Sequence, residues 1–246
     1  MKIIFIILIL FLTINELKSQ IYGLSPSYIN AFSPNSLTKN TLEFEPSFLI
    51  NYINSEFDDN AKIKKIDSSF FNNQFGFRFT YGLLNRLEIG FFIPSHINYS
   101  CFGFKINLVD KEKYGLGLIG GINNDFEATN VWQQWAAGFT TKYSFSKKIK
   151  SEFNAQYSHD FQLPTSKNFH IIIDNAYESE IYNFVLSLNY DRYFADNSIT
   201  ENFQICPAVV CKAELFYASF FFPISLYGRN NYNYKGFGFA LTIPMF

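Results

Sequence analysis

Hydrophobic and polar positions alternate along residues 71–99, in the middle of the first half of the chain. Phe71, Phe75, Phe77, Phe79 and Tyr81 share one parity, and Leu87, Ile89, Phe91, Ile93 and Ile97 share one further on. Side chains of a strand point to opposite faces with a period of two, so the pattern predicts two strands, each with one apolar and one mostly polar face. The Gly82–Asn85 link between them has the residue types of a tight hairpin turn.

The same unit recurs from Leu42 to the last residue and gives about twelve strands. Strands of about ten residues or more suit a tilted membrane-spanning strand better than an ordinary soluble sheet. The links at 82–85, 110–113 and 146–148 are short and fall at every second connection, whereas polar stretches such as 54–68 and 227–235 are expected to be loops. The predicted fold is therefore all-β: a closed antiparallel transmembrane β-barrel of about 12 strands, with both ends of the barrel chain on the periplasmic side.

The start of the chain indicates export. Residues 1–20 carry Lys2, an apolar run from Ile3 to Leu12 and a polar tail, which is the layout of a signal peptide. We expect residues 21–39 to be a periplasmic lead-in and 40–246 to be the barrel, located in the outer membrane of a Gram-negative bacterium. The mean hydropathy of −0.01 fits this assignment, because an alternating strand cancels its own hydropathy.

The composition limits the classes of partner that the chain is expected to bind. Phe and Tyr number 31 and 16, which favours sheets and the aromatic girdles of membrane barrels. The net charge of −1 offers no basic patch for nucleic acid. No metal or cofactor motif is apparent, and three cysteines do not make a disulfide framework. The expected partners are outer-membrane lipid, the barrel-assembly machinery and a small-molecule solute.

The segment Tyr81–Pro94 resembles the hairpin of outer-membrane barrels grouped as the MetA-pathway of phenol degradation, or transporter-like, family. The matching positions are Tyr81, Gly82, Leu83, Asn85, Arg86, Leu87, Glu88, Gly90 and Pro94. The order of the later segments, from Gln162–Thr165 through Asn189–Tyr190 to a closing hairpin, is similar too. The resemblance implies a barrel that passes small, in some members hydrophobic, molecules, and it transfers no residue-level mechanism.

Charged residues on the polar faces are the candidate lumen-lining groups. They are Glu43, Glu45, Arg78, Arg86, Glu88, Lys105, Lys142, Lys150, Glu152, Asp160 and Asp191, with Asp174 and Lys212 on the same faces. They could line a solute path, or they could pair with one another and fill the interior, as in small barrels. We favour pairing, and expect Arg86 and Glu88 to form a structural pair.

Three functions remain open on the sequence: a narrow channel or transporter, a structural or surface-binding barrel, and a lipid hydrolase of the outer membrane. A hydrolase needs a nucleophile beside a base. Ser158 and His159 are adjacent, so they are expected to point to opposite faces. No catalytic residues are therefore assigned, and an enzyme is not expected.

Overall fold

The computed structural model describes residues 23–26, 28–94, 99–125, 132–161, 166–195 and 198–245. The predicted signal peptide lies outside these residues, so it stays a prediction. Within the described residues, no helix has the length and apolar character needed to cross a bilayer.

The described residues form strands throughout. These are β1 (Leu42–Phe57), β2 (Ile63–Leu84), β3 (Leu87–Pro94), β4 (Tyr99–Asp110), β5 (Tyr114–Asp125), β6 (Trp132–Ser144), β7 (Ile149–Asp160), β8 (Lys167–Glu178), β9 (Tyr182–Ala195), β10 (Ser198–Lys212), β11 (Tyr217–Phe221), β12 (Ile224–Arg229) and β13 (Asn231–Met245).

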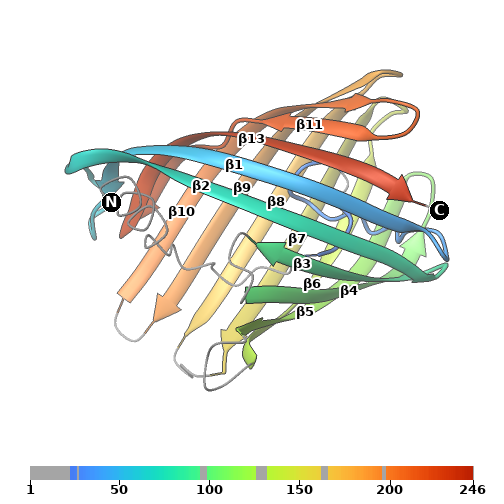
Figure 1. Cartoon of the computed structure of the whole chain (residues 1–246), viewed down its shortest axis with the longest axis horizontal. Helices are drawn as coiled ribbons and strands as arrows, with labels where there is room; N and C mark the ends of the chain where they lie inside the picture. Colours follow the sequence, from blue (N-terminus) through green and yellow to red (C-terminus); the bar gives the residue numbers. More distant parts are fainter. Residues whose placement is uncertain are drawn as a thin grey trace, which may run out of the picture.

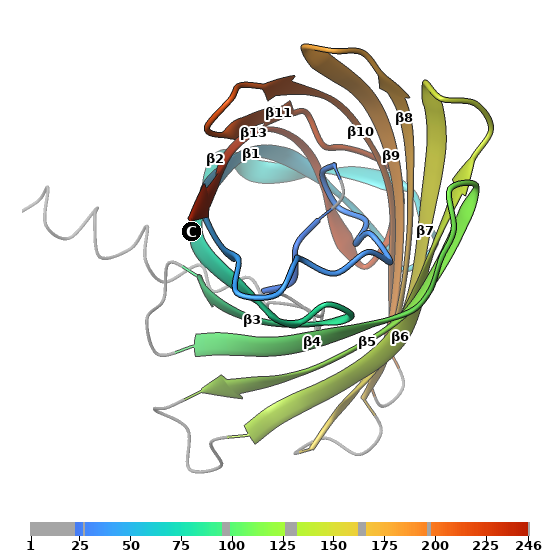
Figure 2. The ribbon, with the colours of Figure 1, turned by 90° about the vertical axis from the view of Figure 1, so that its right-hand side faces the viewer.

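Each strand pairs antiparallel with its neighbour in the chain as far as β10, and β1 pairs with β13 to close the barrel. β11 and β12 both lie between β10 and β13, so the two short strands share one position in the wall. The result is a closed barrel of twelve strand positions, which confirms the predicted fold. Figures 1 and 2 show the wall from the side and towards one end.

The connections separate the two ends of the barrel. Short turns, at 85–86, 111–113, 145–148, 179–181 and 213–216, join strands at the end where β1 begins and β13 finishes. We call this the short-turn end. At the opposite end, the prediction of loops at 54–68 and 227–235 is largely wrong. β1 and β2 continue to Phe57 and from Ile63, and β12 and β13 reverse at Asn230, whose φ of 48° makes a tight turn.

The wall is apolar on its outer face and polar on its inner face, which is the reverse of a soluble protein. Large apolar side chains are exposed on the outside, as at Phe77, Phe104 and Phe184, with exposures of 46%, 43% and 55%. Cross-strand rings pack there, with centroids 4.7 Å apart for Phe91 and Phe102. Inside, the buried groups are mostly amides, hydroxyls and charges. This distribution suits a wall with lipid outside.

The wall has one long unpaired edge in the part of the chain that the structure describes. β2 has 22 residues and β3 only eight, and their pairing extends no further than Gly76 opposite Pro94. From Ile63 to Phe75, β2 has β1 as its only described strand partner. This edge lies in the half of the barrel away from the short-turn end.

Candidate functional site

The interior of the barrel holds the segment expected as a periplasmic lead-in. Residues 23–26 and 28–37, here called the plug segment, cross the lumen and return to the wall before β1 begins, as Figure 2 shows in blue. Leu24 and Ala31 are fully buried inside the barrel. The sequence predicts these residues only as a lead-in to the barrel; their described part lies in the lumen, because the polar inner wall satisfies backbone groups that a non-periodic segment cannot pair within itself.

Glu88 of β3 holds the plug segment at two points. Its carboxylate accepts hydrogen bonds from the backbone N–H of Ser25 (3.0 Å), from the Ser25 hydroxyl (2.8 Å) and from the N–H of Leu37 (2.9 Å). Lys105 of β4 lies 2.9 Å from the same carboxylate, and both side chains are completely buried. Lys105 Nζ also donates to the hydroxyl and carbonyl oxygens of Ser25. A buried ion pair is thus formed around one serine of the plug segment.

Asp174 of β8 makes the second attachment, on the opposite wall. Its Oδ2 accepts three successive backbone N–H groups, from Ile29 (3.3 Å), Asn30 (3.1 Å) and Ala31 (3.0 Å). Consecutive N–H groups that point at one oxygen form a small anion-binding nest. The nest lets a fully buried carboxylate fix the shape of the plug segment in the middle of the lumen.

Further contacts join the plug segment to β6, β7 and β8. The Phe32 carbonyl accepts from Thr140 and from Asn154 Nδ2, and Lys142 donates to Asn35 (3.0 Å). The Tyr28 hydroxyl donates to Glu178, and burial, with that hydrogen bond, raises the pKa of the Tyr28 hydroxyl above its usual range. Tyr28 therefore remains a donor, and the plug segment is attached to strands on both sides of the lumen, from β3 to β8.

Two glycines permit a direct backbone contact between the plug segment and the wall. A Cβ on Gly90 of β3 would lie 1.7 Å from the Gly23 carbonyl oxygen, and Gly23 has a φ of +88°. Neither position accepts a larger side chain without moving the plug segment. The hairpin of β2 and β3 around Gly90 therefore packs with its inner face directly against the plug segment.

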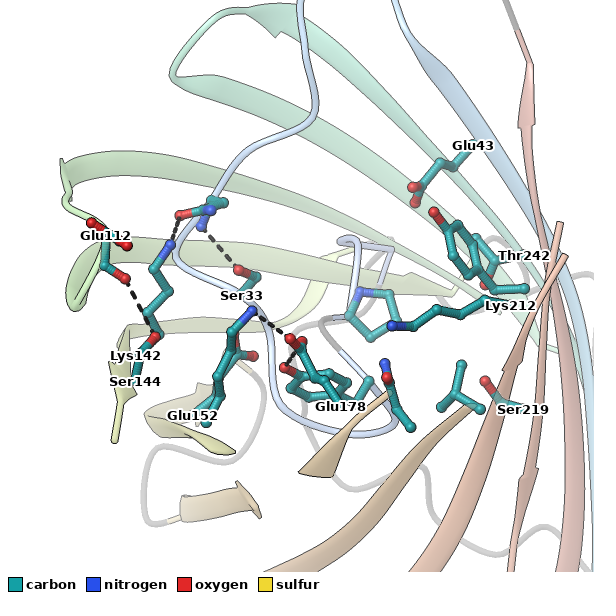
Figure 3. Close-up of a pocket in the computed structure, with 17 residues that line it drawn as sticks. Ser33, Glu43, Glu112, Lys142, Ser144, Glu152, Glu178, Lys212, Ser219 and Thr242 are labelled. Carbon is teal, nitrogen blue, oxygen red and sulfur yellow. Dashed lines mark hydrogen bonds and ion pairs between the residues drawn. The ribbon is translucent and has the colours of Figure 1, made fainter. Parts of the chain in front are cut away.

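A polar cavity of about 370 Å³ lies between the plug segment and the short-turn end. Figure 3 shows its wall, which includes Glu43, Glu112, Glu152, Glu178, Lys142, Lys150, Lys212, Ser144, Ser219 and Thr242. Four carboxylates and three amines give nearly balanced charge, and Lys150 and Glu178 pair at 2.7 Å. The cavity has the mixed charge expected of a hydrated vestibule rather than of an ion-selective filter.

The half of the lumen beyond the plug segment has a different lining, in which uncharged amides and hydroxyls predominate. Tyr234 accepts a hydrogen bond from Asn202 (3.2 Å) and donates to Gln204 (3.1 Å). His170 contacts Asp191 in the same part of the wall. Polar groups there are engaged with one another across strands.

Most of the predicted lumen-lining charges pair within the barrel. Arg78 lies between Glu43 (3.2 Å) and Glu45 (2.7 Å), and is 6% exposed. Lys142 pairs with Asp110, and Asp160, at the end of β7, accepts from Gln134. Arg86 does not: it lies exposed in the turn between β2 and β3, so the expected Arg86–Glu88 pair is wrong and Lys105 takes its place.

Other important residues were not identified by their sequence pattern. The plug segment is held to the wall through its own Ser25 and Tyr28 and through Thr140 and Asn154 of the wall. Each is a common polar residue with no motif around it. The inward parity of Thr140 and Asn154 was the available signal. Their common partner could not be predicted, because residues 21–39 have no periodicity.

Ser158 and His159 point to opposite faces, as expected. Ser158 is 2% exposed, on the inner face, whereas His159 packs against Trp135, with ring centroids 6.2 Å apart. Within the described residues, no cluster of His, Cys, Asp and Glu has the arrangement of a metal site.

Comparison with known proteins gives a fold relationship. Neither sequence models of protein families nor curated protein sequences match the chain. Among solved structures, an outer membrane channel from Pseudomonas putida F1 superposes with a TM-score of 0.68 at 9% sequence identity, over 86% of this chain and 97% of that one. The monoaromatic hydrocarbon channel CymD gives a TM-score of 0.48 at 8% identity, over 85% and 89%. The first of these superpositions, at 9% identity, shows a shared barrel fold.

Proposed function

We propose that this protein is a channel for small molecules, apolar ones included, in the outer membrane of a Gram-negative bacterium. The observation that carries the proposal is the occupied lumen: a wall lined with polar groups encloses a segment that is attached by side chains rather than built into the sheet. An interior packed solely for stability has no need of a polar cavity on one side of such a segment. The shared fold with an outer membrane channel supports the same proposal.

In this mechanism the plug segment controls passage. Solute enters from the end opposite the short turns and meets amide and hydroxyl groups, then the plug segment, which closes the way to the charged cavity. Release of Glu88 and Asp174 from the plug backbone would join the two halves of the lumen. Both carboxylates would then be hydrated, which offsets the loss of their hydrogen bonds.

The unpaired edge of β2 favours apolar solutes among the small molecules. Both faces of the wall are exposed between Ile63 and Phe75, and Phe71 and Phe75 are 57% and 56% exposed there. An apolar solute could pass from the lumen to the bilayer beside this edge without crossing the plug segment. The solute class is therefore expected to extend beyond ions and sugars.

Planar-bilayer recording tests the proposal. The mature chain is expected to give small or infrequent conductance steps, and a variant that lacks residues 23–37 is expected to give large, stable ones. Heat-modifiable gel mobility verifies that each barrel is folded, and Lys105→Met provides a second way to release the plug segment if the deletion does not fold. Silence of every folded variant would contradict a channel and favour a structural barrel.

A second measurement addresses apolar solutes. Cells that produce the protein are expected to take up N-phenyl-1-naphthylamine faster than cells without it. Lys111→Met, which changes a short turn, serves as the control and is expected to give the same uptake as the natural chain. Equal uptake with and without the protein, in the presence of normal conductance, would restrict the channel to polar solutes.

A further inference from the structure

A charged cluster lies on the outer surface of the wall, where most side chains are apolar. Glu201 of β10 is 8% exposed and has Arg192 of β9 and Arg229 of β12 as its direct cross-strand neighbours. Arg192 Nε lies 3.2 Å from one carboxylate oxygen, and Arg229 Nε lies 3.9 Å from the other. A carboxylate on the lipid side of a barrel is costly unless it is paired, so its retention between two arginines needs a reason.

An aromatic row lies next to the cluster, one step nearer the middle of the wall. Tyr190 and Tyr227 are the cross-strand neighbours of Phe203. The hydroxyls of the two tyrosines donate to Glu201, at 3.0 Å to one oxygen and 3.3 Å to the other. Such aromatic rows mark the interface between the hydrocarbon and the headgroups. The two arginines therefore lie at headgroup depth, at the end opposite the short turns.

The guanidinium groups keep donors for a further ligand. Their side chains are 40% and 36% exposed, and in the described part of the chain their sole ionic partner is Glu201. Neither Nε makes an aligned hydrogen bond, although both are buried. The Arg192 guanidinium also lies over the Phe194 ring at 4.8 Å, which fixes its direction. Two guanidinium forks that flank Glu201, one on each side, offer donors of the kind that match the oxygens of a phosphate group.

The local charge favours an anion as well. Lys167 of β8 is exposed on the same outer face, directly opposite Phe194 in the register. Lys167, Arg192 and Arg229 set three positive charges against the single negative charge of Glu201. Phosphates at headgroup depth on a membrane surface are attracted by such a cluster of cations.

We propose that Arg192 and Arg229 bind a phosphate group of the phosphorylated glycolipid that forms the outer leaflet of the outer membrane. Glu201 holds the two guanidiniums in position, and Lys167 adds charge beside them. The orientation of the site rests on the proposed function, because it requires an outer-membrane barrel whose short-turn end faces the periplasm. The binding chemistry is independent of whether the barrel conducts.

Native mass spectrometry of the purified, folded chain tests the site with bisphosphorylated lipid A as the probe. We expect Arg192→Gln/Arg229→Gln to lower lipid A affinity by about tenfold or more, since each charge-assisted contact is among the strong hydrogen bonds. Lys111→Gln/Lys113→Gln removes the same charge at the short-turn end and should leave the affinity unchanged. Glu201→Gln should raise the affinity, because it removes the competing carboxylate while keeping the tyrosine partners.

Four results would overturn the inference. The first two are equal binding of dephosphorylated lipid A and an equal loss of affinity in the double-lysine variant. The third is full displacement of lipid A by millimolar inorganic phosphate, which would indicate a site for free anions. The fourth is natural affinity in a folded double-arginine variant. Loss of conductance alone would count against the channel and leave this site intact.

Discussion

Lys105→Met is the sharpest test of the plug segment. The substitution keeps the length and apolar stem of the side chain but removes the charge that faces Glu88 at 2.9 Å, where both side chains are fully buried. While the plug segment stays docked, Glu88 is then a buried carboxylate without its cation. Removal of one partner from such a pair costs about 3–5 kcal/mol.

The cost falls on docking rather than on the wall. Undocking admits water to Glu88, whereas the strands on either side keep their backbone pairing with one another. At about 1.4 kcal/mol for each tenfold change, the equilibrium between docked and released plug segment should shift by on the order of 10²- to 10³-fold towards release. Lys105→Met should therefore increase the open probability while folding remains intact.

Single-channel recording measures the open probability, and labelling of Ala31→Cys by a membrane-impermeant maleimide, with the native cysteines replaced by alanine, measures release directly. Ala31 is fully buried in the natural chain, so its labelling should be slow until the plug segment leaves. Lys111→Met, in a short turn, is the control for loss of a lysine. Glu88→Gln/Lys105→Met should return part of the way towards natural behaviour, because it leaves no buried charge, while its single amide oxygen replaces only one of the two oxygens that accept from Ser25 and Leu37.

The reasoning would be refuted if Lys105→Met labelled and conducted like the natural chain. It would also be refuted if the double variant released the plug segment more than Lys105→Met alone. In either case, the buried pair would not be what holds the plug segment to β3 and β4.

Two further predictions concern the wall and the start of the chain. Phe220→Lys places a charge on the lipid face and should destabilise the barrel by up to about 2–4 kcal/mol, the midplane value, whereas its neighbour Ser219→Lys points into the polar cavity and should cost less in liposome folding assays. Equal costs would mean that the faces are assigned the wrong way round. Export should remove residues 1–20, so amino-terminal sequencing of the membrane-embedded protein should begin near Gln20 or Ile21, and an intact Met1 would contradict the signal peptide.

Most of the wall could be predicted because alternation is a local property of the sequence. In β9, Phe184, Leu186 and Leu188 face outward and Ser187 and Asn189 face inward, as their parity indicates. One error lies where both faces of a strand are exposed. Residues 63–69 carry Lys64, Lys65 and Asp67 with little apolar alternation, so the start of β2 looked like a loop.

Face assignment was impossible for residues 214–226 from the sequence alone. Aromatic residues occur there at both parities because the segment is divided: β11 ends at Phe221, and β12 begins at Ile224 after Pro223. A register shift opposite Phe203 and Gln204 adds to the irregularity. Proline removes a ladder donor and interrupts the strand, and that interruption depends on neighbours that are distant in the chain.

The site could be predicted only in part. Parity placed Glu88, Lys105 and Asp174 on the inner face, and pairing of charges was the favoured interpretation. The plug segment itself could not be predicted, since its bonds run from backbone N–H groups to carboxylates more than fifty residues away. A segment without periodicity carries no local sign of such partners.

Closure of the wall by its first and last strands sets an order of assembly. One partner of β1 is β2, its neighbour in the chain, but its other partner, β13, is the last of the described strands. The plug segment is joined directly to β1 and is held by strands as distant as β8. It therefore has to be inside when the seam between β1 and β13 forms, or enter afterwards through an open end. Contacts of such long range form slowly. We therefore expect the plug segment to dock among the last steps of folding, and a newly closed barrel to pass through a state in which the lumen is open.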